Sequence, residues 1–395
     1  MATKKFNVYR IIWGCLFCCI MNACHDEEDT IKVFSGKTVL VYMVADNSLT
    51  NYANINMDSI ASGLKSSNCG SKVLVYADRR DGSPELICIE NQGNGRITRS
   101  VLKTYPEQNS VSPTVMTTVL RDMTQSAPAE SYGLILWSHG YGWIPANNNT
   151  KTTTRWFGQD GSYYMEIPEL VTAMNNCGTH FSYILFDACF MGSIETCYAL
   201  RYCADYIIAS PAEILAAGFP YQSAIPYLLG STENDYVKAA TCFYDFYSNQ
   251  KDELRRSGTI SCVKCSELNN MATQTKAIMH AHATELSLLN TSGVQYFEGY
   301  KPHVFHDMGS YVQLFATTEE LKKIEEQFNK TVVYKAHTDK VLSATSWGNT
   351  YIPINTFSGF NTYLWLNGSS AVNDAAYKET EWYAAVFKDI INVGF

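Results

Sequence analysis

The sequence has few charged residues, no repeats and no long apolar runs. Charged side chains make up 17% of its 395 residues, and no basic cluster follows the N-terminal segment, so we expect no nucleic-acid partner. No apolar run reaches the roughly 20 residues that a transmembrane helix needs. No internal repeat or low-complexity tract stands out. What is present is the composition of a globular protein, 46% hydrophobic and long enough for two or three folding units.

The N-terminus has the pattern of an export signal. A positively charged start precedes an apolar run over residues 11–21, which is too short to cross a bilayer. The next Asn-Ala-Cys resembles a bacterial lipoprotein cleavage box with Cys24 as the lipidated residue, although an ordinary signal peptide remains the alternative. The acidic stretch over 25–29 resembles surface-export signals of Bacteroidetes lipoproteins. We expect a signal peptide over 1–23, a tether over 24–37, and an exported protein lipid-anchored to the outer membrane, facing the cell surface.

The cysteines do not form a disulfide or metal framework. Thirteen are present, four of them in the export segment, which leaves an odd number of nine. Cys262 and Cys265 form a CxxC pair, but a zinc or redox site would need a second pair or a strand-to-helix context. They lie in a segment typical of a buried strand, so we expect core cysteines. His280 and His282 would point away from each other on a helix, which argues against a metal site there.

Strands and helices alternate through the first half of the chain. Residues 38–44 form a continuous apolar, β-branched run, typical of a strand buried on both faces. Further strands are predicted over 72–77, 134–137, 183–186 and 206–209, and helices over 57–64 and 116–123. This alternation predicts an α/β fold with a mostly parallel central sheet.

The pattern changes towards the C-terminus. Helical stretches are predicted over 234–247 and 269–289, and strands in later segments such as 361–366. We therefore divide the mature chain into a core over 38–225 and a C-terminal α+β extension over 226–395 that packs on the core.

A histidine and a cysteine directly follow two of the predicted strands. His139 comes after the strand over 134–137, and Cys189 after the strand over 183–186. The carboxyl ends of parallel strands meet at one edge of a sheet, where the chemistry of such folds is found, so we expect the two side chains to be neighbours. An imidazole favours the thiolate, and a helix predicted after Cys189 would lower the pKa of the thiol further. The alternative is a small buried cysteine and an ordinary core or surface histidine.

The residues around this pair resemble the clostripain family of cysteine peptidases (family C11, clan CD). Ser-His-Gly and Phe-Asp-Ala-Cys-Phe-Met-Gly, each after an apolar strand, are diagnostic when they occur together. The resembling segments are 41–47, 138–140, 186–192, 205–210 and 218–221, and the resemblance covers roughly residues 38–395. It implies a caspase-like α/β/α sandwich that hydrolyses peptide bonds in proteins or peptides.

The resemblance also implies roles for single residues. Cys189 is the nucleophile and His139 its general acid and base, while the backbone N–H groups of Cys189 and Gly140 form the oxyanion site. Members typically cleave after Arg or Lys. Asp187 is the candidate to bind that basic side chain, because residues two apart on an extended strand face the same side, and Ser210 is a second substrate-binding candidate. The alternative is that Asp187 caps the following helix or orients the backbone.

One departure from the family leaves a second function open. The stretch over 211–217 is apolar except for Glu213, where the family commonly has acidic residues, a proline and a glycine. This stretch is expected to line the substrate cleft, so the preference at or beside the first pocket is expected to differ. The alternative function is a catalytically weak surface binding protein. Ser138 is not a plausible nucleophile, because the G-x-S-x-G elbow is missing.

The resemblance also has implications for activation and metal dependence. Several members cut themselves between the histidine and the cysteine, and the polar stretch over 147–155 is predicted to be an exposed loop there. Lys151 is the first candidate for self-cleavage and Arg155 the second, although the loop is equally consistent with a linker. The family's namesake requires calcium, but no EF-hand loop is present, so we predict no cofactor and no obligate metal.

Overall fold

The computed structural model describes residues 34–144, 156–345, 348–367 and 370–390. All of them fall in one compact unit. The export signal with Cys24, the tether up to residue 33, and the loop with Lys151 and Arg155 lie outside the described residues. In the part of the chain that is described, no helix combines the length and the apolar character needed to cross a bilayer.

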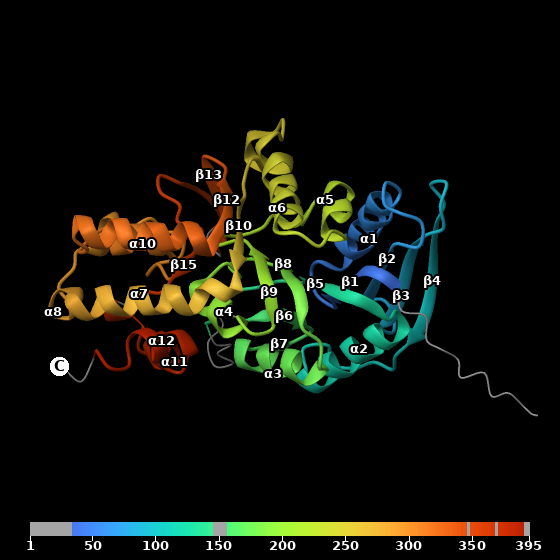
Figure 1. Cartoon of the computed structure of the whole chain (residues 1–395), viewed down its shortest axis with the longest axis horizontal. Coiled ribbons are helices and arrows are strands. Elements are labelled where there is room, and N and C mark those ends of the chain that lie inside the picture. Colours follow the sequence, from blue (N-terminus) through green and yellow to red (C-terminus); the bar gives the residue numbers. More distant parts are fainter. Residues whose placement is uncertain (1–33, 145–155, 346–347, 368–369, 391–395) are drawn as a thin grey trace, which may run out of the picture. The chain divides into compact units, whose positions relative to one another are not determined.

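Among the described residues, nine strands form the central sheet (Figure 1). They are β1 (Phe34–Ala45), β2 (Lys72–Arg79), β3 (Glu85–Asn91), β4 (Ile97–Thr104), β5 (Ala129–Trp137), β8 (Phe181–Asp187), β9 (Ala204–Ala209), β10 (Thr259–Lys264) and β12 (Val332–His337). The five central strands, in the order β9-β8-β5-β1-β2, are parallel. Antiparallel strands flank them at both edges. This arrangement confirms the predicted α/β fold with a mostly parallel sheet.

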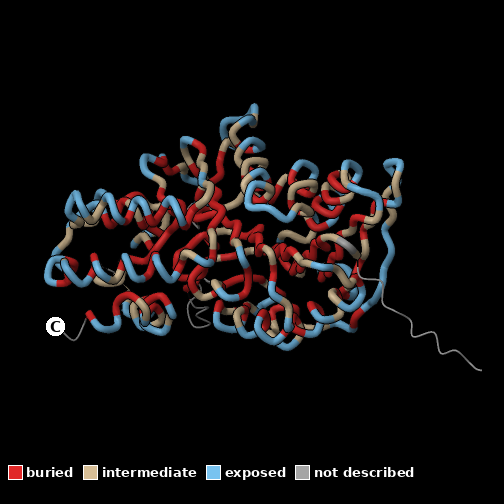
Figure 2. The backbone as a smooth tube through the Cα atoms, in the orientation of Figure 1, coloured by how far each residue is buried: buried red, intermediate tan, exposed pale blue. Residues whose placement is uncertain are grey.

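Helices cover both faces of the sheet. The described residues form α1 (Thr50–Leu64), α2 (Pro113–Ser126), α3 (Ile167–Cys177), α4 (Ile194–Ala199), α5 (Tyr221–Leu228), α6 (Glu233–Ser248), α7 (Leu268–Ala281), α8 (Ala283–Leu286), α9 (Met308–Val312), α10 (Thr318–Thr331), α11 (Ala371–Lys378) and α12 (Glu381–Val386). Successive side chains of β1 enter opposite cores: Val41 packs in the core that includes α1, α5 and α6, and Tyr42 in the core that includes α2 and α3. Figure 2 shows the strands buried between the layers and the outer helix faces exposed.

Among the described residues, three two-stranded antiparallel sheets lie outside the central sheet. The strands are β6 (Phe157–Asp160) with β7 (Tyr163–Met165), β11 (His306–Asp307) with β15 (Asn361–Thr362), and β13 (Lys340–Thr345) with β14 (Gly348–Pro353). The segment β6-β7 follows the histidine in the sequence, and its Gly158 donates a backbone hydrogen bond to the carbonyl of His139 at 3.0 Å. This contact ties the histidine turn to the hairpin.

Several sequence-based boundaries need correction. β1 begins at Phe34, so residues 34–37, predicted to be tether, belong to the sheet. β10 and β12 complete the sheet rather than packing on a finished core, so the predicted division at residue 225 does not separate compact units. The strand predicted over 361–366 covers only Asn361–Thr362, and a 3-10 helix follows at Trp365–Asn367. By contrast, Cys262 and Cys265 are free and buried, which confirms them as core cysteines.

Candidate active site

The sheet register brings the predicted histidine and cysteine together. Trp137 and Asp187, the last residues of β5 and β8, are direct partners across the two parallel strands. His139 and Cys189 each follow two residues later, so they leave the sheet at the same level. Both line one cavity of about 250 Å³ at the carboxyl edge of the sheet. The predicted neighbourhood of the two side chains is therefore present in the structure.

Gly140 allows the two turns to approach each other. A Cβ atom at this position would lie 2.9 Å from the Cβ of Ala188 and 2.9 Å from the carbonyl oxygen of Cys189, which is closer than real Cβ contacts. The backbone N–H groups of Gly140 and Cys189 have no hydrogen-bond partner among the described residues, and both residues line the cavity. Unpaired N–H groups at such a point are the donors that an oxyanion site requires.

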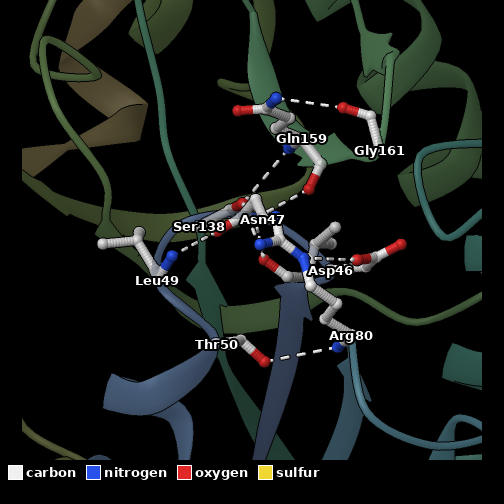
Figure 3. A network of polar contacts seen from close by, with 9 residues as sticks. Asp46, Asn47, Leu49, Thr50, Arg80, Ser138, Gln159 and Gly161 are labelled. Atoms are coloured by element: carbon white, nitrogen blue, oxygen red, sulfur yellow. Dashed lines mark hydrogen bonds and ion pairs between the residues drawn. The ribbon is translucent and has the colours of Figure 1, made fainter.

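The turn carrying His139 is held by a polar network (Figure 3). The amide of Asn47 donates to the carbonyl of Gln159 at 2.7 Å and to that of Val44 at 2.9 Å, and the Ser138 hydroxyl also donates to Val44 at 2.8 Å. These bonds join the end of β1 to both sides of the histidine turn. Burial lowers the pKa of His139, which keeps the imidazole neutral at neutral pH.

Ser48 contacts the predicted histidine and is not among the site residues predicted from the sequence. Its Oγ lies 2.8 Å from Nε2 of His139. Ser48 lies just after β1 and one residue beyond the segment 41–47 that resembles the family. Its place at the carboxyl edge, beside the predicted histidine, was the signal that could have identified it.

The thiol of Cys189 is covered by the backbone of Ile214. The Ile214 N–H donates to Sγ at 3.2 Å, and Sγ lies 3.6 Å from the Ile214 carbonyl oxygen. Burial, followed by the negative charge of Glu213, raises the pKa of Cys189 to about 12. The expected lowering of this pKa by a helix N-terminus is wrong for this conformation, because a turn follows β8 and α4 begins only at Ile194.

Two later segments of the chain fix the loop over the thiol. The Glu213 carboxylate accepts hydrogen bonds from the Ser343 hydroxyl at 2.7 Å and the Ala344 N–H at 3.0 Å, both on β13. Burial raises the pKa of Glu213 to about 7. Near the chain end, the Asn361 amide donates to the carbonyl of Pro211 at 2.7 Å, and its backbone N–H donates to that of Gly192 at 3.1 Å. Hydrogen bonds from β13 and from Asn361 therefore fix the stretch over 211–217.

Asp187 lies against the same cavity. It is 5% exposed, and its Oδ2 accepts from the Phe219 N–H at 2.9 Å and from the Tyr221 hydroxyl at 2.7 Å. Its Oδ1 has no hydrogen-bond partner among the described residues, although Asp187 lines the cavity. Burial raises the pKa of Asp187 to about 6, so it is mainly ionised at neutral pH. β8 ends at Asp187, so Asp187 and Cys189 reach one cavity from a turn rather than from one extended strand.

Ser210 does not fit its predicted role as a substrate-binding residue. Its side chain is fully buried and is not among the residues that line the cavity. Its hydroxyl donates to the Ala212 carbonyl at 2.9 Å and contacts the Thr259 hydroxyl at 2.8 Å. These bonds shape the start of the loop over the thiol, which gives Ser210 a structural function.

No cluster of three or more metal-ligating side chains occurs in the described ranges. The prediction of no obligate metal or cofactor stays a prediction. The residues of the cavity supply a thiol, an imidazole, two carboxylates and two free backbone N–H groups. This combination suits attack of a thiolate on a carbonyl carbon beside a bound cation.

Comparisons with known proteins agree with this chemistry. A model of the clostripain family matches residues 41–382. The chain is similar to an inactive zymogen C11 protease from Parabacteroides distasonis, with 35% identity, a TM-score of 0.78, and coverage of 91% of this chain and 100% of that one.

Two structures from Bacteroides thetaiotaomicron are also similar. One is a secreted C11 cysteine protease in complex with an irreversible peptide inhibitor, with 30% identity, a TM-score of 0.80, and coverage of 90% and 99% of the two chains. The other is a clostripain in complex with the peptide inhibitor BTN-VLTK-AOMK, with 37% identity, a TM-score of 0.52, and coverage of 58% and 97%. A search of curated proteins found no match.

Proposed function

The chain belongs to the clostripain family of cysteine peptidases, and from that premise we propose that it cuts peptide bonds after arginine or lysine through a dyad of Cys189 and His139. One observation carries the proposal: the thiol, the imidazole and the Asp187 carboxylate line a single cavity. The catalytically weak binding protein is the alternative outcome of the test below.

The proposed reaction proceeds in two steps. The imidazole of His139 takes the thiol proton, and Sγ of Cys189 forms a bond to the carbonyl carbon of the substrate. The N–H groups of Gly140 and Cys189 stabilise the resulting oxyanion. As the C–N bond breaks, His139 returns the proton to the leaving amine, and a thioester remains on the enzyme. Water, deprotonated by His139, then attacks the thioester carbon. The C–S bond breaks, the acid is released, and His139 returns the proton to Sγ of Cys189.

The preference for a basic residue is proposed from Asp187. Its carboxylate is almost fully enclosed, and Oδ1 is the oxygen left for a substrate cation. In an enclosed site, an ionised carboxylate without a cation is costly, so a neutral substrate side chain is disfavoured. The similar clostripain from Bacteroides thetaiotaomicron supports this proposal, because its peptide inhibitor, written VLTK, ends in lysine.

The covered thiol supports a latent form of the enzyme. The backbone of Ile214 occupies hydrogen-bonding positions around Sγ, and we propose that the loop over 211–217 moves before catalysis. We place the activating cut within 147–155, at Lys151 or Arg155, which lie outside the described residues. The similarity to an inactive zymogen is consistent with this activation. Export and a lipid anchor at Cys24 complete the proposal for the cellular setting.

The test is cleavage of fluorogenic peptides that differ only in the residue before the cut. The enzyme is the mature chain, with Cys189→Ala and His139→Ala as inactive variants and Cys69→Ala, at an exposed free cysteine, as the matched control. We expect cleavage after Arg and Lys in the parent and in Cys69→Ala. Cleavage after neutral residues would overturn the role of Asp187.

A second readout separates the enzyme from the binding protein. An electrophilic peptide ending in lysine should label the activated parent and leave Cys189→Ala unlabelled. If no peptide is cut and Cys189 stays unlabelled after the 147–155 loop has been opened by an added protease, the peptidase proposal is wrong and the binding protein is favoured.

A further inference from the structure

We propose that Ser48 is a positioning residue for His139, which holds the imidazole through Nε2 and leaves Nδ1 for the proton of Cys189. This inference rests on the proposed dyad. It adds a third side chain to the reaction, from the end of a strand that the predicted site did not include.

The contact between Ser48 and His139 is direct. The 2.8 Å separation of Oγ and Nε2 is a normal hydrogen-bond length. It is the one hydrogen bond made by the His139 side chain within the described parts of the chain. The edge of the ring also packs against Trp156, with 6.5 Å between the ring centroids. One contact therefore sets which nitrogen is engaged, and the other restricts the tilt of the ring.

Ser48 is itself fixed by its neighbours in the chain. Asn47 is 1% exposed, and its Oδ1 accepts the N–H of Leu49 at 2.8 Å while its amide nitrogen donates to the carbonyl of Gln159. Figure 3 shows this turn joined to Ser138 and Gln159, the residues on either side of the histidine turn. The backbone that carries Ser48 is therefore held by the same network that holds the histidine backbone, and the exposed Ser48 side chain binds His139 from that fixed turn.

The hydroxyl can bind the tautomer that the reaction needs. A serine hydroxyl both donates and accepts, and in the proposed dyad it accepts: Nε2–H of the neutral imidazole donates to Ser48 Oγ, and the lone pair lies on Nδ1. When Nδ1 takes the thiol proton, the ring becomes positively charged and the Nε2–H bond to Ser48 becomes charge-assisted, which strengthens it. Ser48 thus stabilises the charge that forms on His139 as the thiolate forms on Cys189.

The experiment compares Ser48→Ala with Ser48→Thr in the activated full chain, on an arginine or lysine substrate. We expect Ser48→Ala to lower kcat about tenfold with KM changed less than about twofold, because only the proton-transfer step loses its orienting contact. The acidic limb of the kcat profile should move to lower pH, because the imidazolium that limits the reaction at low pH loses an acceptor and gives up its proton more readily. Ser48→Thr, which keeps a hydroxyl, should restore both.

The control is Thr50→Ala in the same segment. Thr50 accepts a hydrogen bond from the Arg80 N–H and does not contact His139, so this variant should match the parent. An unchanged kcat and pH profile in Ser48→Ala would overturn the inference, and so would a Ser48→Thr variant as slow as Ser48→Ala. Failure of the dyad itself is a different result, because Cys189→Ala and His139→Ala would then retain activity.

Discussion

The turn that carries His139 and the turn that carries Cys189 end adjacent strands, yet they are held by different contacts. Around His139, side chains of Asn47 and Ser138 bind backbone carbonyls, and among the described residues the imidazole is hydrogen-bonded only at Nε2. Around Cys189, the backbone of Ile214 covers the thiol itself. The imidazole is hydrogen-bonded by a side chain, whereas the thiol is hydrogen-bonded by the backbone of a loop.

This difference indicates that a latent form of the enzyme would depend on the contacts around the thiol rather than on those around the imidazole. The hydrogen bonds to the thiol come from Ile214, in the stretch over 211–217 that Glu213 ties to β13. The contacts on the histidine come from β1 and the β6-β7 hairpin. Moving the loop would therefore expose the nucleophile without disturbing the base. The four predictions below test this division, from the largest expected effect to the smallest.

The largest effect is expected at Asp187. Asp187→Asn keeps an oxygen that can accept from the Phe219 N–H and the Tyr221 hydroxyl, but it removes the charge. We expect kcat/KM for Arg and Lys substrates to fall at least about a hundredfold, because the substrate cation is left unpaired in an enclosed site. Substrates with a neutral residue before the cut should lose little. An equal loss for all substrates would instead indicate a structural role.

A smaller effect is expected where the two turns touch. In Gly140→Ala, the added Cβ meets Ala188 and the Cys189 carbonyl at 2.9 Å and pushes the turns apart. Single-turnover kinetics should show the chemical step slowed about 10- to 100-fold, since an oxyanion donor is displaced. Gly82→Ala is the matched control, because a Cβ there meets nothing within 4 Å. Equal rates in both variants would contradict the proposed oxyanion site.

The cover over the thiol can be loosened in two separable ways. Glu213→Gln removes the negative charge beside Cys189, and Ser343→Ala removes a hydrogen bond that fixes the loop while keeping the charge. Alkylation of Cys189 in the latent protein at pH 8 should become several times faster in both variants. A lower apparent pKa of the thiol is expected only in Glu213→Gln. If neither variant reacts faster, the loop is not what limits access.

The smallest effect concerns stability behind the cysteine turn. Glu195 on α4 is 2% exposed, and burial raises its pKa from 4.5 to about 7. A carboxyl with a raised pKa stabilises the fold while protonated, so this contribution is complete below about pH 4.5 and is lost as the pH rises through 7. In Glu195→Gln the drop in Tm between pH 5 and pH 8 should shrink by about 3 °C. Glu319→Gln, on the exposed face of α10, should leave that drop unchanged.

The contrast between the two turns also explains what the sequence could predict. The central strands were predictable because residues in runs such as 38–44 are buried on both faces of the sheet and are therefore continuously apolar. The alternation of these strands with helices implies parallel strands, whose carboxyl ends lie at one edge of the sheet. His139 and Cys189 follow directly from that edge. β4 was not predictable, because most of its side chains are exposed and the apolar pattern is missing.

The cover over the thiol was not predictable for a different reason. Ile214 contacts Cys189 through its N–H and carbonyl, groups that every residue except proline carries, so the side chain leaves no signature. The predicted role of Ser210 is wrong because its hydroxyl contacts Thr259, a residue 49 positions further along the chain that the local sequence around Ser210 does not reveal. The orientation of Ser48 depends in the same way on Gln159, through Asn47.

The hydrogen bonds of Asn361 have a consequence for the order in which the chain is made. This residue binds Pro211, at the start of the loop over the thiol, and Gly192, in the turn after Cys189, although it lies 150 residues after Pro211 in the chain. A growing chain therefore carries both members of the proposed dyad long before the segment that shapes their cavity has been synthesised. Because these late contacts are missing until then, we expect no peptide-bond cleavage before Asn361 has been synthesised and folded into place.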